Sequence, residues 1–248
     1  MSPLFILTPL FFVISFIYSS VGLGGGSAYI AALAVSGVPY SAIPTIALSL
    51  NLIVSASSWL GYFKSGYFQM RLLLPLVLAS VPAAFVGGLV PFSEKSFYLL
   101  LGLVLFLSAI WILFSREINP SVKKSSSYKK FIVACGIGMV LGFLAGSLGI
   151  GGGIFLAPVL LAIGWTNAKQ TAALTSAFIF LNSFSGLLAH LTKQIPDLTT
   201  WLPLVAVVLL GGVLGSYAGS TLFSTKLVQK VLGIVLMFAS FIIGVKAL

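Results

Sequence analysis

The chain has 248 residues, of which 59% are hydrophobic and only 6% are charged. A soluble domain carries much more charge on its surface, so this composition excludes a soluble globular protein and indicates an integral membrane protein. The net charge is +10, because 13 Lys and Arg residues face only three acidic ones. We interpret this excess as an orientation signal that holds loops in the cytoplasm, and we expect no nucleic-acid partner.

Apolar stretches of membrane-spanning length follow one another along the chain. A transmembrane β-barrel would instead show alternating segments of roughly ten residues. The sequence therefore predicts an all-α polytopic membrane protein. The apolar segments that we expect are 4–20, 27–38, 45–63, 71–91 and 96–114, followed by 131–147, 154–165, 170–192, 201–222 and 227–247.

The two halves of the chain resemble each other. "SVGLGGG" at 20–26 returns as "SLGIGGG" at 147–153, and "LPLV" at 74–77 returns at 202–205. Such self-similarity is typical of a duplicated structural unit. We predict a first transmembrane repeat at 1–114, a basic cytoplasmic loop at 115–130 and a second transmembrane repeat at 131–248.

An odd number of apolar segments in each repeat would invert the second copy relative to the first. If the central loop is cytoplasmic, inversion leaves only Lys95, Lys193 and Lys246 of the 13 basic residues outside. Parallel copies, in which each short segment merely extends its predecessor, leave one more basic residue outside. Because basic residues favour the cytoplasmic side, we expect inverted repeats with both termini outside.

The second segment of each repeat is short. A helix of 12 residues rises only about 18 Å, whereas the hydrocarbon core is about 30 Å thick. Segments 27–38 and 154–165 therefore read as half-helices, each directly preceded by glycines. Irregular backbone at membrane depth is tolerated only where it is buried in protein or lines a cavity. We therefore predict a site near the membrane midplane, where the two glycine-rich breaks meet.

Glycine lets backbone N–H groups approach a ligand without an obstructing Cβ, and the start of the following helix favours an anion. A nucleotide-binding loop is a weaker interpretation, because no Lys-Ser or Lys-Thr follows the glycines and no strand precedes them. Glycines can also serve only close helix packing, which is our interpretation of Gly142, Gly146, Gly211, Gly215 and Gly219. The glycines predicted to bind substrate are Gly22, Gly24, Gly25, Gly26, Gly149, Gly151, Gly152 and Gly153.

Polar side chains inside the third segment of each repeat are the other candidates, because in lipid they need a partner or a cavity. We predict substrate contacts for Ser49 and Asn51 in the first repeat; hydrogen bonds between helices are the alternative role. His190 is a candidate for coupling transport to protons, against a purely structural role. The polar candidates in the second repeat are Thr175, Ser176, Asn182, Ser183 and Ser185, of which we predict substrate contacts for Thr175, Ser176 and Asn182.

Several chemistries are excluded. The acidic residues Glu94, Glu117 and Asp197 all fall in expected loops, which argues against a pump or antiporter for cations. Cys135 is the single cysteine, so neither an internal disulfide nor a CxxC site can form. No HExxH motif, paired carboxylates or Ser-His-Asp set is visible. We therefore expect no enzyme activity, no cofactor and no metal site.

The duplicated G-x-GGG motif, with a short apolar segment and then a Ser/Thr-rich helix such as "TAALTSAFIFLNSFSGLLAHL" at 171–191, resembles the TauE/SafE family of sulfite and organosulfonate permeases. The resemblance covers nearly the whole chain, although "TIALSLNLIVSASSW" at 45–59 departs from the fuller Thr-Ser pattern. It implies an anion permease of a bacterial or archaeal cytoplasmic membrane. The implied substrates are sulfite, sulfoacetate or related sulfur-containing anions, often exported.

The function that we predict is secondary transport of a small oxyanion held between the glycine breaks, with access alternating between the two sides. The first alternative is a channel for anions or neutral solutes. The second is a membrane scaffold subunit that transports nothing. The expected partners are a small anion and the lipid bilayer, and association of the chain into a homo-oligomer stays open.

Overall fold

The computed structural model describes residues 3–39, 42–90, 94–114, 127–192 and 201–247, and within these ranges it is helical with no strand. The predicted all-α class is confirmed. The first half contains α1 (Pro3–Ser20), α2 (Gly26–Val35), α3 (Ile43–Lys64), α4 (Met70–Leu89) and α5 (Glu94–Phe114). The second half contains α6 (Ser127–Leu148), α7 (Gly153–Ile163), α8 (Ala168–Leu191), α9 (Leu202–Tyr217), the π-helical turn η2 (Ala218–Leu222) and α10 (Thr225–Ala247).

Six of the described helices are long and apolar enough to cross a membrane by length and composition, which supports a multi-pass membrane protein. They are the helices labelled α3, α4, α6, α8, α9 with its π-helical turn, and α10. The helices α2 and α7 have only 10 and 11 residues and rise about 15 Å and 17 Å, roughly half the thickness of the hydrocarbon core. The prediction of two half-helices is confirmed.

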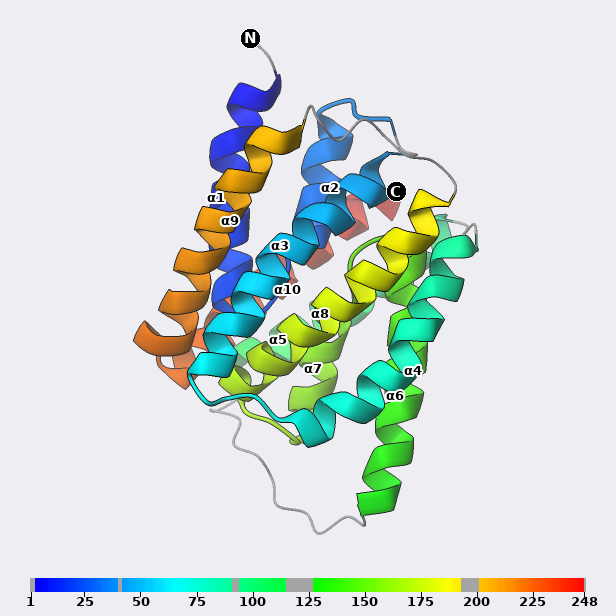
Figure 1. The fold of residues 1–248 in the computed structure, drawn as a ribbon, viewed down its shortest axis with the longest axis vertical. Helices are drawn as coiled ribbons and strands as arrows, with labels where there is room; N and C mark the ends of the chain where they lie inside the picture. Colours follow the sequence, from blue (N-terminus) through cyan, green and yellow to red (C-terminus); the bar gives the residue numbers. More distant parts are fainter. Residues whose placement is uncertain (1–2, 40–41, 91–93, 115–126, 193–200, 248) are drawn as a thin grey trace.

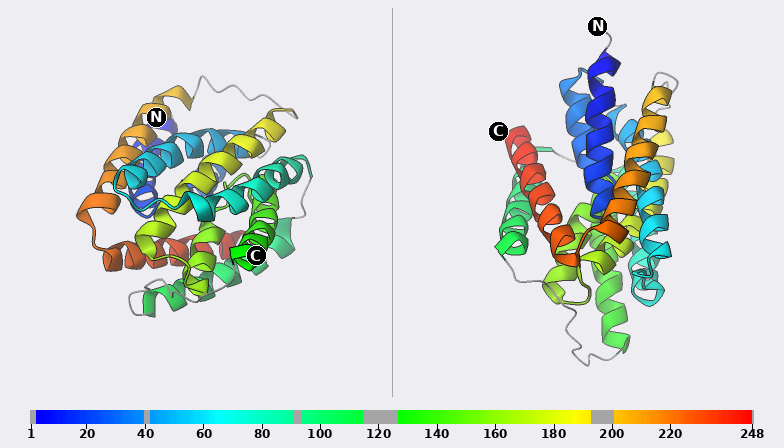
Figure 2. Two further views of the ribbon diagram at one scale, coloured as in Figure 1. Left: turned by 60° about the horizontal axis from the view of Figure 1, so that its bottom comes forward. Right: turned by 90° about the vertical axis from the view of Figure 1, so that its left-hand side faces the viewer.

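The helices α3 and α8 lie side by side in the middle of the molecule (Figure 1). Within their spanning windows 61% and 72% of the residues are buried, compared with 28–44% in the other four spanning helices. Outside them, α1 packs along α9, α4 packs along α6, and α5 packs along α10 (Figure 2). The buried polar residues of α3 and α8, such as Asn51 and Thr175, are therefore shielded from lipid by the surrounding helices.

Glycines allow the α4–α6 and α1–α9 pairs to pack closely. A Cβ added to Gly142 or Gly146 of α6 would overlap the backbone of α4 at Ser80 or Ala84. In α9, a Cβ on Gly215 would overlap the backbone of α1, and the same holds for Gly219 in the π-helical turn. The close-packing interpretation of these glycines is therefore confirmed, and both glycine rows belong to the second half of the chain.

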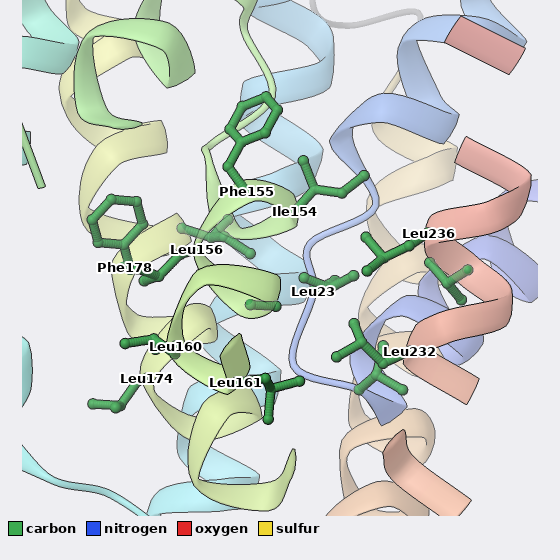
Figure 3. Packing of buried hydrophobic residues seen from close by; sticks show 14 of the residues in the cluster. Leu23, Ile154, Phe155, Leu156, Leu160, Leu161, Leu174, Phe178, Leu232 and Leu236 are labelled. Atoms are coloured by element: carbon green, nitrogen blue, oxygen red, sulfur yellow. The ribbon is translucent and has the colours of Figure 1, made fainter. Parts of the chain in front are cut away.

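The hydrophobic core surrounds the point at which the chain leaves α1. Leu23 lies between α7 and α10 and packs with Ile154, Leu161 and Leu232 in one buried cluster (Figure 3). Leu23 is 1% exposed, so the segment between α1 and α2 is anchored within the protein interior. The irregular backbone at this depth is buried in protein, as a membrane environment requires.

Candidate functional site

Two irregular segments precede the half-helices, and we call them the first glycine loop (residues 21–25) and the second glycine loop (residues 149–152). Gly22 and Gly25 have φ angles of +74° and +84°, and the equivalent Gly149 and Gly152 have +70° and +79°. These angles lie in the left-handed region, which side chains other than glycine rarely adopt. The repeated motif thus places left-handed glycines at two equivalent positions of each loop, but the loops differ between them, because Gly151 has a φ angle of +71° and its counterpart Gly24 has no positive φ.

Each glycine loop packs against a long helix of the opposite half. A Cβ on Gly22 would overlap the backbone of Ala172 in α8, and a Cβ on Gly149 would lie 2.8 Å from the Cβ of Pro44 in α3. Thr175 of α8 donates its hydroxyl to the carbonyl oxygen of Gly22 over 3.0 Å. The loops therefore sit between the halves rather than within either one.

Asn51 of α3 lies where the two glycine loops meet. Its Nδ2 donates to the carbonyl oxygen of Ile150 over 3.3 Å and to Ser183 Oγ over 3.4 Å. A Cβ on Gly24 would overlap Asn51 Oδ1, and a Cβ on Gly151 would lie 2.7 Å from Asn51 Nδ2. Asn51 is fully buried. One amide side chain is thus in close contact with both loops.

The backbone amides of the two loops leave donors unused. Six glycines have a backbone N–H that donates to no backbone or side-chain acceptor within the described residues. They are Gly24, Gly25 and Gly26 in the first half and Gly151, Gly152 and Gly153 in the second. All six glycines are buried. A buried N–H without an acceptor costs about 1–3 kcal/mol, so these groups favour a ligand that brings acceptors.

The remaining glycines of the predicted set support the loops. Gly26 begins α2, and a Cβ there would lie 2.8 Å from Asn51 Nδ2. Gly25 faces the ring of Tyr29, and Gly152 is the N-cap of α7. Gly153 begins α7 and packs against the side chain of Ile179. The predicted glycines are therefore gathered at the starts of the two half-helices.

Three of the predicted polar residues hydrogen-bond to their own helices. Ser49 Oγ donates to the Thr45 carbonyl oxygen over 2.8 Å, and Ser176 Oγ donates to that of Ala173 over 3.0 Å. Asn182 Nδ2 donates to the carbonyl oxygen of Phe178 over 2.8 Å. Thr175 also donates within α8, to the carbonyl oxygen of Thr171 over 2.8 Å. Hydrogen bonds join Asn51 and Thr175 to the glycine loops, whereas those of Ser49, Ser176 and Asn182 stay within α3 or α8.

His190 lies near the end of α8, away from the glycine loops along the chain. Its Nε2 is 3.1 Å from the carbonyl oxygen of Gly146 in α6. This contact connects α8 to the close-packed α4–α6 pair. A role in proton coupling stays a prediction.

The fold brings two further groups to Asn51, one of which, Ser183, the sequence offered only as one of several polar candidates. Ser183 is one of several hydroxyl residues in α8, and only the tertiary packing distinguishes it. Ile150 contributes a backbone carbonyl, which no side-chain pattern can reveal. Trp59, on α3, also has a buried Nε1 donor without a partner among the described residues.

The site offers mostly hydrogen-bond donors. The free loop N–H groups and Asn51 Nδ2 donate, while Asn51 Oδ1 accepts nothing within the described part of the chain. Rotating the amide would place its oxygen against the Ile150 carbonyl oxygen, so the Nδ2 contact fixes the orientation. The described residues include no group of His, Cys, Asp and Glu that could hold a metal ion. The arrangement suits a small molecule that is rich in acceptor oxygens.

Comparison with known proteins places the chain in a family. Residues 7–246 match the family described as sulfite exporter TauE/SafE. A probable membrane transporter protein y4hK of Sinorhizobium fredii is 36% identical over 233 residues, which are 92% of each chain.

Two more distant relatives match most of the chain as well. The probable membrane transporter protein YunE of Bacillus subtilis is 27% identical, over 88% of this chain and 89% of the relative. The probable membrane transporter protein MJ0441 of Methanocaldococcus jannaschii is 28% identical, over 76% and 74%. No solved structure matches. With nearly its whole length matched, the chain belongs to the sulfite exporter TauE/SafE family of membrane transport proteins.

Proposed function

We propose that the protein is a secondary-type transporter that moves small sulfur-containing oxyanions, such as sulfite or sulfoacetate, out of the cell. The anion would bind where the two glycine loops meet at Asn51. The observation that carries this proposal is the set of buried loop N–H groups that have no acceptor within the described residues. An oxyanion supplies several acceptor oxygens in a small volume and would satisfy these donors together.

Electrostatics also favour an anion. The loops lead into the starts of α2 and α7, where the partial positive charge of a helix N-terminus lies. The described membrane-spanning residues include no acidic side chain within α3, α4, α6, α8, α9 or α10. A cation at the same position would meet N–H groups and no carboxylate, which would make binding unfavourable.

Alternating access would come from two inverted repeats, residues 1–114 and 131–248, joined by the basic segment 115–130. The helix pairing supports this arrangement. The helices α1 and α4 of the first half correspond to α6 and α9 of the second, and the observed pairs α1–α9 and α6–α4 are exchanged by that correspondence. The colours in Figure 1 also run in opposite directions along α3 and α8. Rocking of one repeat against the other would then expose Asn51 to each side in turn.

The membrane orientation follows from the same repeats. We place 115–130 in the cytoplasm and both termini outside a bacterial or archaeal cytoplasmic membrane. The described chain begins and ends toward the same end of the molecule (Figure 1). The distribution of basic residues gives this orientation, because it leaves few of them outside.

The substrate class is inferred from the family description, which names sulfite export. Sulfite and sulfonates carry three oxygens on one sulfur, and their compact form suits donors that converge from two loops. Asn51 Oδ1 offers one acceptor beside these donors. A protonated oxyanion such as hydrogen sulfite would therefore fit, because its hydroxyl donates while its other oxygens accept.

The proposal is tested by uptake of radiolabelled sulfite into proteoliposomes with imposed pH and charge gradients. Wild-type protein should show saturable uptake that unlabelled sulfonates inhibit, and Gly24→Ala, whose new Cβ would overlap Asn51 Oδ1, should reduce that uptake strongly. Uptake that never saturates would identify a channel. A folded wild-type protein that moves neither sulfite nor sulfonates would contradict the proposal, and the scaffold alternative would then be tested by purification with partners.

A further inference from the structure

Lys169, in the first turn of α8, is the most deeply buried basic residue among those the structure describes. It is 6% exposed. The other described Lys and Arg residues whose exposure is known lie at the molecular surface or are partly exposed. A buried ammonium group is costly unless it is paired or serves a function. The role of Lys169 therefore depends on whether its neighbours carry a compensating negative charge.

The described neighbours of Lys169 carry no negative charge. Its Nζ donates to the carbonyl oxygen of Ser220, in the π-helical turn after α9, over 3.1 Å. The same atom lies 5.1 Å from the ring centroid of Tyr67, in the segment between α3 and α4. A carbonyl and an aromatic face stabilise a cation but leave its charge uncompensated. The ammonium group has three donors, and only one of them has a recorded acceptor.

The position of Lys169 on α8 makes its surroundings more positive still. The start of a helix carries a partial positive charge, where an acidic residue would be favourable and a lysine is not. The first turn of α8 contains no acidic residue. It is capped by a neutral pair instead, because Asn167 Oδ1 accepts from the backbone of Gln170 over 2.9 Å and Gln170 Oε1 accepts from that of Asn167 over 3.1 Å.

Lys169 is also connected to the central site through α8. Thr175, which donates to Gly22, lies six residues further along the helix, a rise of about 9 Å. Ala172, which packs against Gly22, lies between them. Tyr67 and Tyr62 pack with this part of α8. Along α8, a positive charge therefore lies within about one to two turns of the residues that contact the first glycine loop, on the side where α7 leads into α8.

We propose that Lys169 forms a second anion-binding station, which holds the transported oxyanion between Tyr67 and the π-helical turn before it reaches, or after it leaves, the glycine loops. The inference rests on the proposed function. The oxyanion supplies the negative charge that the described neighbours lack and accepts the remaining ammonium donors. Tyr67 lies over the ammonium group and must move aside for an anion to approach from its side.

Substitution by methionine separates an anion-binding role from a structural one. Lys169→Met keeps the length of the side chain and removes its charge. If Lys169 serves the anion, the Tm without ligand stays equal or rises, because an uncompensated buried charge is lost. The sulfite concentration for half-maximal uptake should rise about tenfold or more. The increase in Tm that sulfite produces in detergent should shrink in parallel.

The controls are Lys64→Met and Lys169→Arg. Lys64 is an exposed lysine at the end of α3, so its replacement should leave both readouts at their wild-type values. Lys169→Arg keeps the charge and should retain most of the sulfite affinity. Glu117→Gln tests whether a carboxylate outside the described residues forms an ion pair with Lys169. If it does not, this substitution should not lower the Tm.

Three outcomes would overturn the inference. One is saturable wild-type uptake that Lys169→Met leaves unchanged, which would leave the proposed function intact. Another is a lowered Tm in Lys169→Met with normal sulfite affinity, which would make the lysine structural. The third is an equal loss of Tm in Lys169→Met and Glu117→Gln that is not additive, which would indicate an ion pair. A wild-type protein that neither binds nor transports sulfite or sulfonates would overturn the proposed function together with this inference.

Discussion

The side chain of Asn51 donates to the carbonyl oxygen of Ile150, 99 residues further along the chain, over 3.3 Å. This contact joins a central helix of the first half to the glycine loop of the second. Because Asn51 also contacts Gly24, its amide contacts both loops, and a shift of either loop would change its contacts.

Asn51→Leu should abolish saturable sulfite uptake while the protein stays folded. The substitution keeps a similar side-chain volume but leaves the Ile150 carbonyl oxygen without its donor, which we expect to cost about 1–2 kcal/mol of stability. Proteoliposome uptake and thermal unfolding in detergent measure the two effects. The matched control is Ser65→Ala, because Ser65 follows the last residue of α3 and, within the described part of the chain, its Oγ donates to the carbonyl oxygen of Gly61 in that helix. Equal uptake by Asn51→Leu and wild type would remove Asn51 from the site.

Gly24→Ala should reduce uptake at least about tenfold, because the new Cβ overlaps Asn51 Oδ1 and forces the amide out of its position between the loops. The φ angle of Gly24 is not positive, so the effect isolates the steric contact from backbone strain. Gly136→Ala in α6 is the control, since nothing lies within 4 Å of the added Cβ. It should retain uptake and gain up to about 1 kcal/mol of stability. Wild-type uptake by Gly24→Ala would show that transport does not need the close approach of Gly24 to Asn51.

Thr175→Val should weaken uptake several-fold and lower the free energy of unfolding by about 1 kcal/mol. Valine retains the shape of threonine but cannot donate to the carbonyl oxygen of Gly22, so the first loop loses its tie to α8. Thr221→Val is the comparison, because that hydroxyl is exposed and bonds within its own helical turn. Uptake and chemical or thermal unfolding should be measured on both. A larger effect from Thr221→Val would contradict this assignment.

Gly142→Ala and Gly215→Ala should each destabilise the protein by about 1–3 kcal/mol, because the new methyl group meets backbone atoms of the adjacent helix. Backbone cannot rotate out of the way as a side chain can. The measurement is the Tm of the purified variants, again with Gly136→Ala beside them. Two variants as stable as the wild type would mean that the α4–α6 and α1–α9 pairs can separate at little cost.

Single cysteines test the orientation of the repeats in a Cys135→Ser background. With inverted repeats, an impermeant maleimide added outside intact cells should label Ser36→Cys and Thr192→Cys but not Ser65→Cys. Parallel repeats would place Thr192 in the cytoplasm instead. Thr192 therefore decides between the two arrangements, while Ser36 and Ser65 serve as the outside and inside references.

Local pattern predicted the helices well, because each apolar segment must satisfy its own backbone hydrogen bonds in lipid. The segment expected at 170–192 is observed as Ala168–Leu191, and that expected at 154–165 as Gly153–Ile163. The helix α6 begins four residues before the expected 131, because its polar first turn, "SYKK", is helical as well. The π-helical turn at Ala218–Leu222 was not predicted, since it depends on the local packing of α9.

The contacts of the site were only partly accessible from the sequence. The repeated glycines and Asn51 could be selected because both are unusual in an apolar segment. The choice among hydroxyl residues could not be made, because Ser176 and Ser183 lie in the same Ser/Thr-rich helix and differ only in what packs beside them. Lys169 likewise looks like an ordinary interfacial lysine until the π-helical turn and Tyr67 are placed around it.

The exchange of contacts between halves has a consequence for biosynthesis. Gly22 packs against α8 and Gly149 packs against α3. Neither loop therefore has its packing partner until both halves are in the membrane. When synthesis has passed only the first half, Asn51 and the first loop lack the packing partners that α7 and α8 provide. The first half therefore stays incompletely packed until α8 has been synthesised. Separately expressed halves should be degraded alone and rescued together.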